Sequence, residues 1–154
     1  FKMLKKIFLL VLTLIFISGC EYKPIYSISN KSDYKIIITE LSGDKKMNKF
    51  LTIALKRNSQ EDADKIVNIK IDTKYTKIIL AKDSAGDVTD YQSNAVTTFL
   101  INRNQTSKTF TINEKFNFQK MTDKYEEKGY EENIKRNLAT AIAQKLILRL
   151  SVNQ

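Results

Sequence analysis

The sequence has 154 residues, of which 42% are hydrophobic and 28% charged, and its formal net charge at pH 7 is +9. That length suits one domain with its own core, and these proportions exclude a chain that is disordered over most of its length. Histidine is absent, which excludes a histidine-dependent hydrolase or zinc enzyme. The positive charge permits nucleic acid, an anionic membrane or another acidic ligand as a partner, but most of it is expected to be solvated surface lysine.

The first apolar run, Ile7–Ile17, has the layout of a secretory signal peptide. Two lysines precede it, and the small residues Ser18 and Gly19 separate it from Cys20, the only cysteine. A helix of this length rises about 16 Å, roughly half the hydrocarbon thickness of a bilayer. We therefore expect residues 1–19 to be cleaved rather than to span a membrane.

The segment Ile17–Cys20 resembles the bacterial lipobox, the site at which lipoprotein precursors are acylated and cleaved. The resemblance implies that Cys20 carries an S-diacylglycerol and an N-acyl chain such as palmitate. Several acyl chains anchor a protein far more firmly than one. Residues 20–33, which contain the only proline, are then expected to form an acylated N-terminal tether.

A strand and an amphipathic helix are predicted after this tether. The segment Tyr34–Leu41, YKIIITEL, is β-branched at its centre and ends at a Ser-Gly-Asp turn signal, which predicts a buried strand. From Asp44 the apolar residues take helical spacing, and this helix is expected to end near Asn58, before a polar loop over residues 58–64. We expect its stripe to face a core rather than a membrane surface, because the domain also contains strands. The stripe comprises Met47, Phe50, Leu51, Ala54 and Leu55.

Hairpin-linked strands are predicted next. Residues 67–75 alternate apolar and polar side chains, which is typical of a half-buried strand. Ile78 and Leu80 have the opposite parity, so either the buried face changes or a bulge intervenes. Turn residues at 82–87, KDSAGD, and at 102–107, NRNQTS, then bound a strand that should include residues 95–102.

The last predicted strand has two clearly different faces. One face is apolar and carries Phe110, Ile112, Phe116 and Phe118. The other face, the polar row, consists of Thr109, Thr111, Asn113, Lys115, Asn117 and Gln119.

A long helix is predicted over residues 130–150. Glu131 and Glu132 suit its positive start, and Lys145 and Arg149 suit its negative end. The complete order predicts an α+β fold for residues 34–154: a two-layer sandwich with two helices packed on one face of a four-stranded, mostly antiparallel sheet, in the order β-α-β-β-β-α. The apolar stripe of this helix comprises Ile134, Leu138, Ala141, Ile142 and Leu146.

Catalytic and metal-binding motifs are not found in the sequence. It has no G-x-S-x-G elbow and no phosphate-cradling glycine loop, and the pairs Glu61-Asp62 and Glu126-Glu127 are interpreted as solvated loop charge. We therefore expect neither an enzyme nor a metal or cofactor site. A binding function is therefore the remaining possibility. Lys120, Lys124 and Lys128 have four-residue spacing, so in a helix their ammonium groups would share one side and could contact an anionic head group. The alternative is a solvated linker.

The sequence resembles the LPS-assembly lipoprotein family LptE. The likeness rests on the lipobox, on the predicted element order and on four segments: EYKPIY (21–26), AKDSA (81–85), TDYQ (89–92) and IKRNLATAIAQKLILRL (134–150). It implies a lipoprotein anchored on the periplasmic side of the outer membrane, which plugs the LptD β-barrel and binds lipopolysaccharide (LPS) without catalysis. Nucleic acid is not an expected partner.

The resemblance also implies which surfaces contact the barrel and LPS. A plug needs polar faces that complement a polar barrel lumen, so the polar row is the candidate barrel-facing surface. The family's basic contacts lie on the central hairpin and before the last helix. The hairpin here offers only Lys82 beside three aspartates, which leaves Lys120, Lys124 and Lys128 as the LPS-binding candidates.

Two other functions remain open from the sequence. The same anchor and positive charge fit an auxiliary lipoprotein of a phospholipid or solute ABC-type transport system. A hydrolase that uses carboxylates is a weaker alternative.

Overall fold

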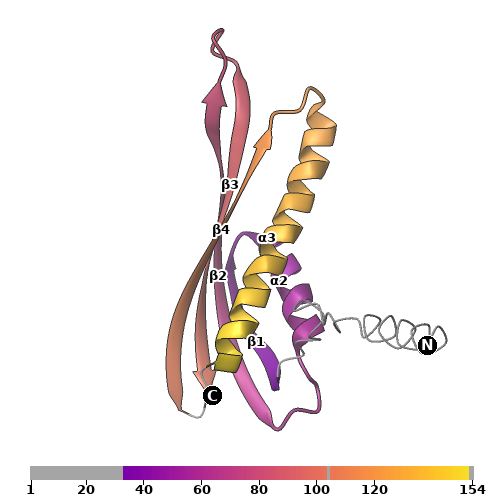
Figure 1. Cartoon of the computed structure of the whole chain (residues 1–154). Helices are drawn as coiled ribbons and strands as arrows, with labels where there is room; N and C mark the ends of the chain where they lie inside the picture. Colours follow the sequence, from indigo (N-terminus) through magenta and orange to yellow (C-terminus); the bar gives the residue numbers. More distant parts are fainter. Residues whose placement is uncertain (1–32, 104, 153–154) are drawn as a thin grey trace, which may run out of the picture.

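A computed structural model describes residues 33–103 and 105–152 (Figure 1). The proposed leader, Cys20 and the tether up to residue 32 lie outside these residues. The fold class predicted from the sequence is confirmed: two helices pack against a four-stranded sheet, in the order β-α-β-β-β-α. The elements are β1 (Tyr34–Gly43), α2 (Lys45–Asn58), β2 (Lys65–Lys82), β3 (Val88–Arg103), β4 (Thr106–Gln119) and α3 (Lys124–Val152).

The strands lie in the order β1-β2-β3-β4. β1 and β2 are parallel and joined through α2, whereas β2, β3 and β4 are antiparallel neighbours joined by hairpins. The β2–β3 hairpin extends beyond the helices at one end of the sheet (Figure 1). The start of α3 lies at that same end, and the first described residues and the end of α3 lie at the other (Figure 1).

One face of the sheet supplies the core. Val67, Ile69 and Ile71 are buried, as their alternation predicted, and the register places Ile71 opposite Phe99. Phe99 pairs in turn with Phe110 on β4. Residues of both helices belong to the same buried cluster, so the two helices cover this one face and leave the other open. The core stripe predicted for α2 is confirmed. In α3 four of the five predicted residues are buried, but Ala141 is only partly buried, and Ala139 and Ala143 belong to the core instead.

The turn between β1 and α2 needs glycine. Gly43 has a φ of +86°, and a Cβ there would lie 2.0 Å from the carbonyl oxygen of Thr73. Asp44 follows, and its backbone N–H donates to that same oxygen at 2.8 Å. The Asp44 carboxylate accepts from the Met47 N–H at 2.8 Å and so caps α2.

The predicted details of two strands differ from the structure. β1 is not a buried strand, since Ile37 is 37% and Leu41 46% exposed: β1 is an edge strand, and only its beginning lies under α2. Ile78 and Leu80, together with Ile79, are about half exposed. The β2–β3 register shifts between Ile79 and Ala81, so a bulge is present at Leu80, as one of the two expected explanations requires. This bulge comes after Ile78 and does not explain the position of that residue, and the buried face does not change, because Ile78, Ile79 and Leu80 are all about half exposed.

Helix α3 begins at Lys124, earlier than the predicted Tyr130. The Asp123 carboxylate accepts from the Tyr125 N–H at 2.6 Å and from the Glu126 N–H at 3.3 Å, which explains the early start. Glu131 and Glu132 therefore lie beyond the first turn and do not complement the positive end of the helix. Within the described residues, no helix is both long enough and apolar enough to cross a membrane.

Candidate functional site

The face of the sheet opposite the helices, called here the open sheet face, contains the predicted polar row. All six residues of that row are exposed. The register pairs Thr111 with Thr98 and Asn117 with Gln92 on the central strand β3. The Gln92 amide donates to the Asn117 side-chain oxygen at 2.9 Å, and the Thr98 and Thr111 hydroxyls lie 3.3 Å apart. The row is thus the outer part of a wider surface of amides and hydroxyls.

The β1–β2 half of the open sheet face carries paired charges beside the exposed isoleucines Ile37 and Ile66. Lys70 forms an ion pair with Glu40 at 2.8 Å, and the Ser42 hydroxyl donates to the Asp72 carboxylate at 2.7 Å. These exposed contacts contribute little to stability. Together with the polar row, these paired charges and uncharged donors and acceptors suit contact with another largely polar surface rather than burial in lipid.

The three candidate lysines lie at the end of the domain where α3 starts, and all are exposed. Lys124 and Lys128 are on α3, so the predicted helical spacing holds for these two. Lys120 lies outside the helix, where its backbone N–H donates to the Thr89 carbonyl at 2.7 Å. Lys120 and Lys124 line one shallow hollow together with Asp123 and Glu126. Lys128 is not among the residues that line it, so the structure brings together two of the three.

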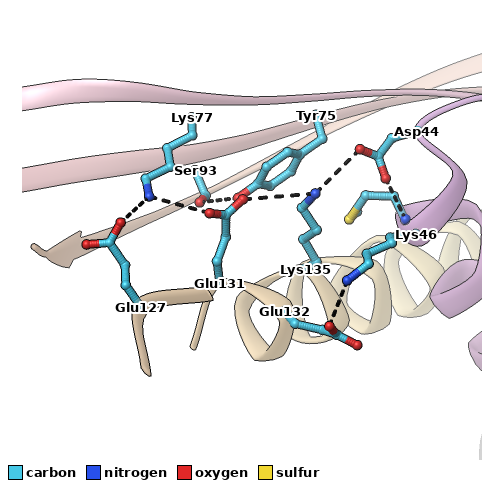
Figure 2. Close-up of polar contacts among 10 residues, drawn as sticks. Asp44, Lys46, Tyr75, Lys77, Ser93, Glu127, Glu131, Glu132 and Lys135 are labelled. Atoms are coloured by element: carbon cyan, nitrogen blue, oxygen red, sulfur yellow. Dashed lines mark hydrogen bonds and ion pairs between the residues drawn. The ribbon is translucent and has the colours of Figure 1, made fainter. Parts of the chain in front are cut away.

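An ion-pair network fixes this end of α3 to the sheet (Figure 2). The Lys77 ammonium on β2 lies 2.7 Å from Glu127 and 3.4 Å from Glu131, and 4.0 Å from the ring centroid of Tyr91. Glu127 also accepts from the Met121 N–H at 3.1 Å. Interpreting Glu127 as solvated loop charge was therefore wrong: its side chain is 17% exposed and holds the segment between β4 and α3 in place.

The network shifts the pKa values of its members. Burial disfavours the charge of Lys77, but its hydrogen bond to Glu127 and the charge of Glu131 outweigh this, so the pKa of Lys77 is raised. The hydrogen bond from Lys77 lowers the pKa of Glu127. Both groups are thus held in their charged forms at neutral pH.

A second part of the network lies nearer α2 (Figure 2). Lys135 on α3 contacts Asp44 at 3.5 Å and Glu131 at 4.0 Å, and its ammonium lies 3.9 Å from the ring centroid of Tyr75. The Tyr75 hydroxyl is 2.6 Å from the Ser93 hydroxyl, and burial raises the pKa of Tyr75. Because each charged group here has a partner, the cluster offers neither a free base nor a nucleophile, and its role is to position α3.

Sequence reasoning missed this network because its partners are distant in the chain. Lys77 and Glu127 are separated by 50 positions, and neither belongs to a local motif. The only available signal was spacing, because Lys77 continues the alternation of the buried residues from Val67 to Tyr75. Among residues 33–103 and 105–152, no group of three or more metal-ligating side chains occurs.

Comparison with known proteins supports the fold. The sequence matches no protein-family model and no curated protein. The structure is similar to that of rare lipoprotein B from Shewanella oneidensis, with 15% identity, a TM-score of 0.55 and coverage of 75% of this chain and 93% of that one. It is also similar to a putative lipoprotein from Caulobacter crescentus (10% identity, TM-score 0.57, 80% and 91% covered) and to a minor lipoprotein from Acinetobacter baumannii (16% identity, TM-score 0.53, 78% and 94% covered).

The protein therefore has the rare lipoprotein B fold, in agreement with the resemblance seen in its sequence. At these identities the likeness concerns the fold alone. Each of these matched structures is described as a lipoprotein.

Proposed function

We propose that the protein is an outer-membrane lipoprotein that plugs an LptD-type β-barrel and binds LPS without catalysis. In this proposal residues 1–19 are cleaved and the acylated Cys20 anchors residues 34–154 through the tether 20–33. The open sheet face is the observation that carries the proposal. It is long, polar and uncovered by either helix, in a fold shared with solved lipoproteins.

The chemistry of the open sheet face supports enclosure by a polar wall. The interior of a large outer-membrane barrel is polar, and each unpaired amide or hydroxyl that is removed from water there must find a hydrogen-bond partner. Asn113 and Lys115 are exposed and make no side-chain hydrogen bond within the described residues. They are therefore available to the wall of the barrel.

The end of the domain near the start of α3 supports the second part of the proposal. LPS carries phosphates, and exposed ammonium groups bind phosphate as point charges. Lys120 and Lys124 share one hollow, and the contacts of Glu127 with Lys77 and Met121 hold the segment that carries them. Lys128 adds a third exposed charge one turn further along α3.

Site-specific crosslinking in intact cells tests the proposal. A photoreactive amino acid at Asn113 should give a crosslink to a large outer-membrane β-barrel protein. The same group at Ala85, at the tip of the exposed β2–β3 turn, serves as the matched control and should crosslink differently. Crosslinks from Asn113 to inner-membrane transport proteins would instead support the alternative function as a transporter lipoprotein, and recovery of only the uncrosslinked monomer would contradict the plug.

A further inference from the structure

A cationic pocket lies at the opposite end of the domain from the three candidate lysines. It has a volume of about 280 Å³ and lies between the β3–β4 hairpin and the end of α3. Both of these elements reach the lower end of the molecule in Figure 1. Its principal lining residues are Ile101, Arg103, Lys108, Phe110, Arg149 and Leu150.

The pocket combines an apolar base with a positive rim. Ile101 is 4% and Leu150 6% exposed, so both belong to the edge of the core. Three cationic side chains surround them, and none of the described residues that line the pocket is acidic. Lys108 forms no ion pair with any acidic residue in the part of the chain that the structure describes.

The positions of these cations are unusual for the helix-covered face. Lys108 pairs with the buried Ile101 and so belongs to the same face as the core residues of β4. Glu114 is another charged residue on the same face of β4, but it forms an ion pair with Lys145. Arg149 complements the negative end of the α3 dipole. That role explains the presence of Arg149, but it does not explain the other two cations, Arg103 and Lys108.

Two of the cations are held in place by rings. The Arg103 guanidinium donates to the Tyr34 hydroxyl at 2.8 Å and lies 5.3 Å from the Tyr34 ring centroid. That contact uses one of its five N–H donors. Arg149 lies 5.7 Å from the ring centroid of Phe110. These contacts preorganise the rim, which reduces the entropy lost when a ligand binds.

We propose that this pocket binds the head group of an anionic phospholipid. The phosphate would contact Lys108, Arg103 and Arg149, and the first methylenes of the lipid would pack on Ile101 and Leu150. The volume fits a head group and a short length of chain, not a whole lipid. An inorganic anion would use the charges alone and leave the apolar base unoccupied.

Proximity to a membrane favours a lipid as the occupant, and this step rests on the proposed acylation of Cys20. Tyr34, which contacts Arg103, is 14 positions beyond Cys20. An extended chain of that length spans at most about 50 Å. Because Arg103 contacts Tyr34, the first residue of β1, the cationic pocket lies at the end of the described domain where the tether joins it.

Titration with short-chain lipids tests this proposal. Full-length protein in a non-ionic detergent is titrated with dihexanoyl phosphatidylglycerol, dihexanoyl phosphatidylcholine and inorganic phosphate, and binding is followed by calorimetry and by NMR shifts of Ile101 and Leu150. We expect saturable binding of phosphatidylglycerol only. Lys108→Gln and Arg149→Gln should each weaken it by roughly tenfold, as the loss of one charge-assisted contact predicts. Lys82→Gln, at the far hairpin, is the matched control and should not change it.

Three results would overturn the assignment. Equal binding of phosphatidylcholine would show that the cations are not used, equal binding of phosphate would reduce the site to an anion pocket, and unchanged binding by both variants would place the lipid elsewhere. Unchanged melting temperatures of the variants exclude misfolding as the cause of a loss. Because the titration involves no barrel protein, its result is independent of the crosslinking from Asn113.

Discussion

The two faces of this sheet are built from alternate residues of the same strands, yet the polar side chains on the two faces make different contacts. On the helix-covered face, charged side chains such as Lys77 and Lys135 form ion pairs with carboxylates and cation–π contacts with tyrosine rings. On the open sheet face the polar row is exposed and mostly uncharged. The first face uses charge to fix α3 in position, whereas the second leaves donors and acceptors for a partner. The proposed barrel contact therefore depends on exposed polar side chains, several of which, such as Asn113 and Lys115, make no side-chain hydrogen bond within the described residues.

The largest expected effect is a difference in protein stability between a substitution on the helix-covered face and one on the open sheet face. Phe99→Ala, on the helix-covered face where Phe99 is fully buried, should lower the free energy of unfolding by about 4 kcal/mol, because it leaves a cavity in the core. Thr98→Ala, the neighbouring residue on the open sheet face, should change it by less than about 0.5 kcal/mol. Urea unfolding of both variants makes the comparison, and a similar loss in both would contradict it.

The next effect concerns the ion-pair network. Glu127→Gln should lower the free energy of unfolding by about 1 to 2 kcal/mol, because Lys77 loses its closest partner while it remains largely buried. Glu126→Gln removes an exposed carboxylate one position away and is the matched control. Equal stabilities of the two variants would show that the network does not position α3.

The pH dependence of stability refines this result. The pKa of Glu127 is lowered from its ordinary value of 4.5 in the folded state, so its contribution is fully present above about pH 4.5 and is lost as the pH falls through the lowered pKa. The pKa of Lys77 is raised above 10.5, so its contribution is present below that value and is lost at higher pH. Unfolding free energies measured from pH 2 to pH 6 should fall less steeply for Glu127→Gln than for the wild type. Parallel curves would argue against the pairing.

The smallest effect on stability should accompany a large effect on binding. Replacing Lys120, Lys124 and Lys128 together by glutamine should leave the melting temperature nearly unchanged, because all three are exposed. Binding of LPS should weaken by roughly tenfold or more, since several charge-assisted contacts are lost. The triple variant Lys45→Gln, Lys49→Gln and Lys56→Gln, on α2, is the control with the same charge change. Unchanged LPS binding by the first variant would remove these lysines from the site.

Local sequence patterns were sufficient for most of the fold. The alternation from Val67 to Tyr75, the stripe of α2 and the two faces of β4 each depend on side-chain period, which the sequence displays directly. The errors have tertiary causes. Ile37 and Ile78 look like core residues, but one lies on an edge strand and the other on a hairpin that no helix covers.

The candidate site was predictable only in part. The polar row was visible because it alternates with phenylalanines, and the structure places it on the exposed face. The separation of Lys120 from the helix was not visible, because the start of α3 depends on capping by Asp123 and on the contact of Glu127 with Met121. The cationic pocket combines residues of β3, β4 and α3, and no sequence motif brings these together.

The most direct test of the central claim is native mass spectrometry of the protein extracted from membranes with its partners. The plug proposal predicts a complex with one large β-barrel protein, in which the mature chain begins at a triacylated Cys20. A free monomer that still carries residues 1–19 and an unmodified Cys20 thiol would contradict it.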